Sequence, residues 1–258
     1  MILHGIESGA VEGRRPVVLL HGLFGAARNF GTAQRAIAQA QRVICLDLRN
    51  HGESPHSVGM DYDTMAGDVL ETLMERGALP CALVGHSMGG KVAMRVALRK
   101  PEVVARLLVS DIAPVAYRPA SADYAHAMQA LPLAPGLSRA AADAMLAKAV
   151  PEPSVRAFLL QNLMFGAQPR WRIGLANIVA GLADIGDWPP VPKDAVYGGP
   201  TLFVAGARSD YIRPDHRSAI RALFPAARFV TVKDAGHWVH ADNPAGFLGV
   251  LNAFLAAG

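Results

Sequence analysis

Cysteine is scarce in this sequence, since only Cys45 and Cys81 occur in 258 residues. Both lie in apolar, strand-like segments without a CxxC partner, so we expect buried, reduced, structural cysteines and no metal site built on cysteine. Long apolar runs are also missing, because none approaches the ~20 residues that a membrane helix needs. Residues 1–16 lack the charged-then-apolar pattern of a signal peptide. We therefore expect a soluble, cytoplasmic protein without a membrane span.

Basic clusters are equally rare, although the net charge is +4 and the pI is about 9.3. The 25 Lys and Arg residues are scattered, and the longest basic runs are pairs such as Arg14-Arg15 and Arg99-Lys100. No aromatic-interleaved basic stripe and no finger or knuckle spacing occurs, so we expect no nucleic-acid partner. A mildly basic enzyme with a small-molecule substrate is the better interpretation, and anionic substrates such as acyl-CoA would suit it. The oligomeric state does not follow from the sequence.

Short runs rich in Val, Ile and Leu alternate with segments of helical period. Such runs, without clean polar alternation, are typical of parallel strands covered on both faces. The alternation predicts a doubly wound, mostly parallel α/β sheet. The expected strands are 16–20, 42–48, 81–85, 106–112, 201–207 and 228–235, and the expected helices are 30–40, 63–76, 88–100, 214–223 and 244–257.

The alternation is interrupted once, between residues 114 and 192. Ala-rich helical segments separated by prolines fill this stretch, and no convincing strand occurs in it. Because the strand pattern resumes at Thr201, we expect residues 114–192 to form a helical lid inserted into one core, which comprises residues 1–113 and 193–258.

A serine bracketed by glycines occupies the junction between an expected strand and an expected helix. The motif is Gly85-His86-Ser87-Met88-Gly89. A turn this sharp strains its central residue, and glycines on both sides let neighbouring backbone pass without a Cβ clash. The GxSxG motif in this context predicts a nucleophile elbow that exposes the Ser87 hydroxyl at the carboxyl edge of the sheet.

A serine nucleophile needs a base, and a histidine that follows the last strand is expected to supply it. His237 lies in the segment DAGHWVH, between the last strand and the last helix. His240, three residues later, is the alternative. We favour His237 because Gly236 frees the turn that would point its side chain toward Ser87.

A carboxylate must orient the imidazole, and two positions qualify. Asp111 follows the strand next to the elbow's strand, where the active sites of such sheets form. Asp210 follows a later strand, one residue beyond the usual acid position of this fold, which holds Ser209. We favour Asp111, with Ser209 hydrogen-bonding near it, and keep Asp210 as the alternative acid.

The segment HGLFG, residues 21–25, follows the first core strand. The backbone N–H of Leu23 or Phe24 and that of Met88 can converge on one oxygen there. We therefore predict an oxyanion hole, in which each donor contributes a few kcal/mol to the transition state.

These motifs together resemble the α/β-hydrolase family across nearly the whole chain. HGLFG, DLRNHGESP, GHSMGGK, SDIAPVAY and AGHWVHADNP follow in the expected order, and the set is similar to the bacterial YbfF-type esterases. The resemblance implies hydrolysis of esters, including acyl-CoA thioesters, and an acid in the DIAPV segment, which corresponds to Asp111. The serine at position 209 also fits that subgroup. Asp210 is a departure that leaves a second carboxylate available.

The expected chemistry is two-step acyl transfer without a metal or an organic cofactor. His237 takes the proton of Ser87, which attacks the acyl carbonyl, and water then hydrolyses the acyl-enzyme. We expect the lid to set the acyl preference, with Trp171, Trp238 and Met164 at the substrate.

Fold alone does not fix activity, so alternatives stay open. An aspartate at the elbow would indicate a haloalkane dehalogenase or an epoxide hydrolase, but this chain has Ser87. A cofactor-free haloperoxidase (perhydrolase) or C–C hydrolase also uses serine. A perhydrolase or a lyase on this fold would need an additional acid/base lysine or particular pocket groups. The sequence offers no clear candidate for either. A non-catalytic ligand-binding protein with the same fold is a further alternative.

Overall fold

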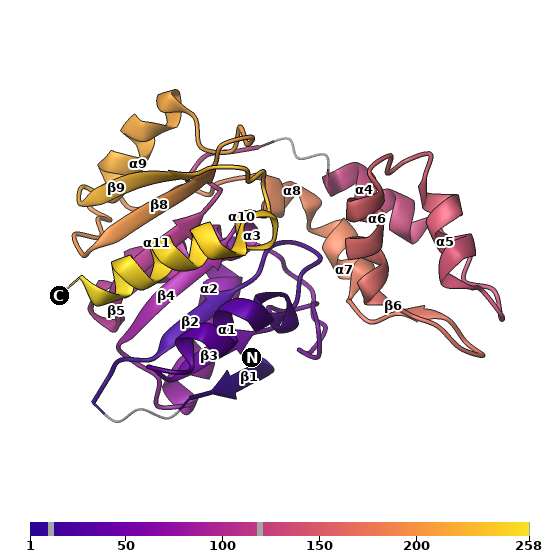
Figure 1. Cartoon of the computed structure of the whole chain (residues 1–258), viewed down its shortest axis with the longest axis horizontal. Helices are drawn as coiled ribbons and strands as arrows, with labels where there is room; N and C mark the ends of the chain where they lie inside the picture. Colours follow the sequence, from indigo (N-terminus) through magenta and orange to yellow (C-terminus); the bar gives the residue numbers. More distant parts are fainter. Residues whose placement is uncertain (10–12, 118–120, 258) are drawn as a thin grey trace.

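The computed structural model describes residues 1–9, 13–117 and 121–257, and its centre is a seven-stranded sheet (Figure 1). The strand order is β1-β3-β2-β4-β5-β8-β9, and every neighbouring pair is parallel except β1 with β3. The strands are β1 (Gly5–Ser8), β2 (Val17–Leu20), β3 (Val43–Leu46), β4 (Cys81–His86), β5 (Val104–Ser110), β8 (Thr201–Gly206) and β9 (Ala227–Val232). The predicted mostly parallel, doubly wound α/β sheet is confirmed.

Helices cover both faces of this sheet, as the alternating pattern predicts. One face packs against α2 (Tyr62–Glu75), α3 (Met88–Arg99) and α9 (Arg217–Leu223). The other packs against α1 (Gly31–Ile37) and α11 (Pro244–Ala256), which lie in front of the sheet in Figure 1. The short α10 (Val239–Asp242) precedes α11 and was not predicted.

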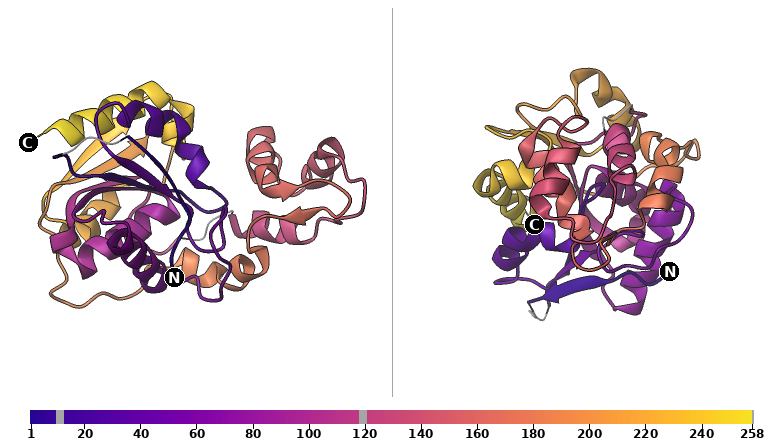
Figure 2. Two further views of the ribbon diagram at one scale, coloured as in Figure 1. Left: turned by 90° about the horizontal axis from the view of Figure 1, so that it is seen from below. Right: turned by 90° about the vertical axis from the view of Figure 1, so that its right-hand side faces the viewer.

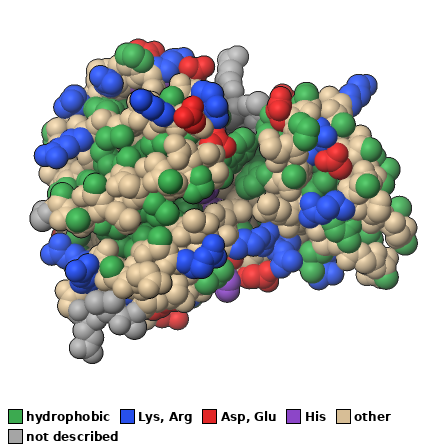
Figure 3. Space-filling view, viewed as in Figure 1, with side chains coloured by type: hydrophobic (Ala, Val, Ile, Leu, Met, Phe, Trp, Pro, Cys, Tyr) green, Lys and Arg blue, Asp and Glu red, His purple; other side chains and the backbone are tan. Residues whose placement is uncertain are grey.

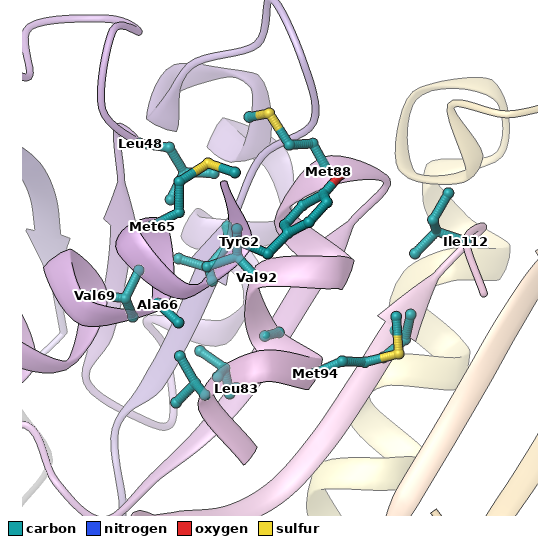
Figure 4. Close-up of a cluster of buried hydrophobic side chains, with 14 of the residues drawn as sticks. Leu48, Tyr62, Met65, Ala66, Val69, Leu83, Met88, Val92, Met94 and Ile112 are labelled. Atoms are coloured by element: carbon teal, nitrogen blue, oxygen red, sulfur yellow. The ribbon is translucent and has the colours of Figure 1, made fainter. Parts of the chain in front are cut away.

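Two hydrophobic clusters follow from this layering. Successive side chains of β2 alternate between them: Val18 and Leu20 join the cluster under α2 and α3, whereas Val17 and Leu19 join the one under α1 and α11. This alternation is the two-residue period of a strand buried on both faces. Figure 4 shows the first cluster, in which Met65 and Val69 of α2 meet Val92 of α3. The close packing fixes α3, and therefore the strand-to-helix turn that begins it.

A helical segment is inserted between β5 and β8. It contains α4 (Ser121–Gln129), α5 (Arg139–Leu146), α6 (Pro153–Leu159), α7 (Leu175–Ala180) and α8 (Leu182–Gly186). These helices lie beyond one end of the sheet, at the right of Figure 1 and of the left view in Figure 2. The prediction placed a lid at 114–192, of which 118–120 lie outside the described residues.

Two short strands in this segment contradict the expectation that it holds none. β6 (Leu163–Met164) and β7 (Arg170–Trp171) pair as an antiparallel hairpin. Two-residue strands leave almost no periodic signal, which is why the pattern missed them. The edge strand β1 was also missed, because its sequence GIES is short and polar.

In the described part of the chain, no helix has both the length and the apolar character needed to cross a bilayer.

Candidate active site

The glycines around Ser87 allow close backbone approach at the turn between β4 and α3. A Cβ on Gly85 would overlap the carbonyl oxygen of Gly89, and a Cβ on Gly89 would overlap the carbonyl of Leu20 in β2. Neither glycine has a positive φ. Close packing of the turn against itself and against β2 therefore requires these glycines, as the motif predicts.

Ser87 carries the strain of this turn, with φ 52° and ψ −121°. Such a conformation is rarely adopted by a residue with a Cβ and costs on the order of 1–3 kcal/mol. Its backbone is held on both sides, because Ser87 N–H donates to Ser110 O at 2.9 Å and Ser87 O accepts from Gly90 N–H at 2.8 Å. The turn directs the side chain away from the sheet at the carboxyl end of β4.

A continuous hydrogen-bonded chain runs from Ser87 to Asp111. The Ser87 hydroxyl donates to His237 Nε2 at 2.9 Å, and His237 Nδ1–H donates to Asp111 Oδ2 at 2.8 Å. The three residues come from the β4–α3 turn, the loop after β9 and the end of β5. Tyr211 stacks on the His237 ring, with centroids 4.0 Å apart, and further restricts its orientation.

Asp111 is fully buried and has a complete set of donors. Gly206 N–H donates to Oδ1 at 3.0 Å, and the Ser209 hydroxyl donates to Oδ2. Both carboxylate oxygens therefore accept a hydrogen bond, which fixes the orientation of the buried carboxylate. Asp210 is exposed, and the structure gives it no hydrogen bond to His237. Of the two carboxylates weighed from the sequence, Asp111 is the one that contacts the imidazole.

The alternative base, His240, faces away from this chain of hydrogen bonds. Its ring packs against Phe30, Phe247 and His86, and its Nδ1 is buried without a partner among the described residues. Burial lowers the pKa of His240 to about 4. His240 therefore belongs to the packing between the elbow and α11, whereas His237 contacts Ser87.

The predicted oxyanion donors differ in availability. The Phe24 N–H already donates to His51 Nε2 at 3.1 Å. His51 is fixed for this role, because its Nδ1–H donates to Arg49 O at 2.8 Å and leaves Nε2 as the acceptor. Burial lowers the pKa of His51 to about 3, so it stays neutral. Leu23 and Met88 are the remaining amides of the predicted set, and both residues line the cavity described next.

A cavity of about 250 Å³ opens beside Ser87 and His237. Core residues such as Ile112 form one side, and Val155, Phe158 and Leu159 of α6 form the other. Figure 3 shows hydrophobic side chains gathered in the hollow between the core and the helical segment. The cavity next to Ser87 is therefore small and mostly apolar, as is usual for small-molecule sites.

Of the three predicted substrate contacts, only Trp238 lines this cavity. Trp171 and Met164 belong to the β6–β7 hairpin, away from Ser87. Trp171 packs both on the small core of the helical segment, with Leu131, Leu146, Leu160 and Leu163, and on the edge of the main hydrophobic cluster. The sequence does not reveal which face of the segment turns toward the core.

Lys91, Tyr211 and His86 also line the cavity, and the sequence reasoning missed them. Lys91 follows the serine by four residues, so helical spacing could have placed it one turn beyond the nucleophile. His86 Nε2–H donates to the backbone oxygen of His237 at 2.8 Å and anchors the loop that carries the imidazole. Nothing in the local pattern points to that contact, because the two residues are 151 positions apart.

Comparisons with known proteins agree with this architecture. The family model described as alpha/beta hydrolase fold matches residues 15–244. The mouse protein named sn-1-specific diacylglycerol lipase ABHD11 is 43% identical over 249 residues, which cover 93% of this chain and 80% of the relative. Esterase YbfF of Escherichia coli K12 is 33% identical over 241 residues, covering 93% and 92% of the two chains.

A solved structure titled marine microorganism esterase superposes with a TM-score of 0.93 at 31% sequence identity. The match covers 98% of this chain and 99% of that one. With the family model, the curated relatives and the matching architecture together, this chain belongs to the α/β-hydrolase family.

Proposed function

We propose that this protein is a serine hydrolase that cleaves carboxylic esters through an acyl-enzyme on Ser87. The observation that carries the proposal is the unbroken hydrogen-bonded chain from Ser87 through His237 to Asp111, beside an apolar cavity. Relatives named esterase and lipase support the same reaction class.

In the proposed first step, His237 Nε2 accepts the Ser87 proton while Oγ attacks the acyl carbonyl. The imidazolium is stabilised by Asp111, which accepts from Nδ1–H, and the two donors on Asp111 hold that carboxylate in place. The developing oxyanion accepts from the amides of Leu23 and Met88. Phe24 leaves the predicted donor set, because its amide is already bonded to His51.

The imidazolium then gives its proton to the departing alcohol or thiol. In the second step, His237 takes a proton from water, which attacks the acyl-enzyme and releases the acid. Every proton in this sequence moves through His237, so no metal or organic cofactor has a part in it.

We propose that the inserted segment, residues 114–192, acts as a lid over the core formed by 1–113 and 193–258. Residues of α4, α6 and α8 contribute to the cavity wall, so this segment would select the acyl group. Asn162 Nδ2 donates to Phe24 O at 2.8 Å and connects the same segment to the loop of the proposed oxyanion hole. Cytoplasmic location stays a prediction from the sequence.

Hydrolysis of p-nitrophenyl butyrate by the purified wild type and by Ser87→Ala tests the proposal. We expect turnover in the wild type and its loss in the folded variant. Butyryl-CoA and a dispersed diacylglycerol, assayed beside it, decide between a thiol leaving group and the lipid ester named for the mouse relative. No turnover in a folded wild type would favour a ligand-binding protein, and halogenation or perhydrolysis without ester cleavage would favour the perhydrolase alternative.

A further inference from the structure

Lys91 is a buried cation in the cavity wall that the proposed acyl transfer does not use. Its side chain is only 1% exposed. Its backbone N–H donates to Ser87 O at 3.1 Å, so it lies one helical turn beyond the nucleophile. An acyl group attached to Ser87 would therefore extend into the same cavity that Lys91 lines.

The Lys91 ammonium is held by the end of α8 and by two aromatic rings. Nζ donates to Asp187 O at 2.6 Å and to Gly186 O at 3.4 Å. It lies 5.2 Å from the ring centroid of Tyr62 and 5.0 Å from that of Tyr117. These contacts occupy two of the three ammonium protons, and they are of a kind that attracts a cation, namely ring faces and carbonyl oxygens.

The hydroxyl groups of these tyrosines are engaged elsewhere. Tyr62 OH donates to Ile185 O at 2.6 Å, and Tyr117 OH donates to Tyr211 O at 2.5 Å. Neither hydroxyl is therefore directed at Lys91 as its hydrogen-bond partner. The rings position the ammonium in the cavity wall without completing its coordination.

No carboxylate among residues 1–9, 13–117 and 121–257 forms an ion pair with Lys91. The Asp187 side chain is exposed, and its Oδ1 accepts from Trp188 N–H instead. Buried charges in proteins are normally paired, since an isolated charge in an apolar site is unfavourable. Burial accordingly lowers the pKa of Lys91 to about 7. The negative charge of Asp187 offsets this effect only in part, and no carboxylate of the described residues contacts the ammonium.

We propose that Lys91 is a specificity-determining residue that binds a carboxylate at the far end of the acyl group. The preferred substrates are then half-esters of short dicarboxylic acids, and this inference rests on the proposed ester hydrolysis at Ser87. The remaining ammonium proton donates to the carboxylate, while apolar neighbours such as Ile112 and Leu159 contact the methylene groups. The volume of about 250 Å³ restricts the chain to a few carbons.

Two esters with five-carbon acyl groups test this inference. Monoethyl glutarate carries a terminal carboxylate, whereas ethyl pentanoate ends in a methyl group. We expect the wild type to give at least a tenfold higher kcat/KM for the half-ester, the order of one charge-assisted hydrogen bond in a buried site. Monoethyl succinate and monoethyl adipate then locate the optimal chain length. In Lys91→Met this preference should disappear. Because both esters are measured with the same variant, the ratio of their kcat/KM values is insensitive to a general loss of rate.

Arg95→Met is the matched control for a purely structural role. Arg95 lies one turn further along α3, is also buried, and likewise donates to backbone oxygens, at Pro189 and Pro190. Unlike Lys91, it also forms an ion pair with Asp63, so its substitution is the more severe structural change. It does not line the cavity. We therefore expect Arg95→Met to change both esters by the same factor and to keep the ratio. If Lys91→Met behaves in the same way, Lys91 is only an anchor for α8 and the inference is wrong.

The ratio should also depend on pH. Above pH 7 the free ammonium loses its proton, so the preference of the wild type for monoethyl glutarate should fall as the pH rises. A pH-dependent change in the protonation of His237 would affect the hydrolysis of both esters equally, so it would not alter the ratio of their kcat/KM values. A ratio that stays constant from pH 6 to pH 9 would contradict the assigned role.

Calorimetric binding of glutarate separates this inference from the proposed function. We expect at least tenfold weaker binding to Lys91→Met than to the wild type or to Arg95→Met. If no ester is hydrolysed but glutarate binding still depends on Lys91, the proposed function fails and the carboxylate site stands. If p-nitrophenyl butyrate is hydrolysed but the wild type shows no preference for the half-ester, the inference fails and the ester hydrolase stands.

Discussion

Asp111→Asn gives the sharpest test of the proposed triad, because the structure dictates how the new amide would be oriented. Gly206 N–H donates to the position of Oδ1, so the amide oxygen must occupy it. The NH₂ group then takes the position of Oδ2, where it faces His237 Nδ1 and Ser209 Oγ. An N–H donor opposite Nδ1 makes that nitrogen the acceptor and moves the imidazole proton to Nε2. A protonated Nε2 cannot take the proton of Ser87.

We therefore expect kcat/KM for p-nitrophenyl butyrate to fall about 10³–10⁴-fold in Asp111→Asn, the size of the loss that the wrong tautomer causes in a Ser-His-Asp protease. This factor corresponds to about 4–5.5 kcal/mol of transition-state stabilisation. The fold should survive, because the amide keeps the size of the carboxylate and can satisfy the same neighbours. Asp210→Asn is the matched control, and we expect it to change the rate less than about threefold, since Asp210 is exposed.

Initial rates for the two variants, together with thermal unfolding of each, decide the matter. Equal losses, or a larger loss in Asp210→Asn, would refute the tautomer reasoning and return Asp210 to consideration. A small loss in a stably folded Asp111→Asn would show that the carboxylate does not control the imidazole.

Three further predictions concern the elbow, a buried histidine and the loop of the proposed oxyanion hole. Ser87→Gly and Ser87→Ala should both lose ester turnover, but Ser87→Gly should be the more stable by about 1 kcal/mol in denaturant unfolding, since glycine relieves the strain at φ 52°; equal stabilities would argue against strain. The pKa of His240 is about 4 in the folded protein and about 6.5 in the unfolded chain. The contribution of the neutral His240 to the free energy of unfolding is therefore complete above pH 6.5 and is lost as the pH falls toward 4. The wild type should therefore lose about 2–3 kcal/mol more than His240→Leu across that range, and parallel pH profiles would contradict the assignment. His51→Ala leaves the Phe24 N–H without its acceptor, so kcat should fall about tenfold with a smaller change in KM, whereas an unchanged kcat would show that this bond does not position the loop.

Much of the fold and part of the site could be predicted because their signals are local. The apolar strands from 16 to 235 and the helices between them appear in the structure with boundaries shifted by a few residues. The glycines of the elbow are required by contacts within a single turn and its neighbouring strand. The missed strands, β1 and the β6–β7 hairpin, are too short or too polar to leave a periodic pattern, and the missed helix α10 is a single turn.

The sequence by itself determined the order of the six parallel strands and their main helices, the strained turn at Ser87 and a histidine after the last strand, because each depends on neighbouring residues. Only the tertiary structure decided that Asp111 rather than Asp210 lies against His237, and that Trp171 and Met164 lie away from the cavity. It also decided that Lys91 is enclosed between Tyr62 and Tyr117. These contacts join segments separated by tens to more than a hundred residues, and their geometry follows from how the sheet and the inserted helices pack together, which local propensity does not encode.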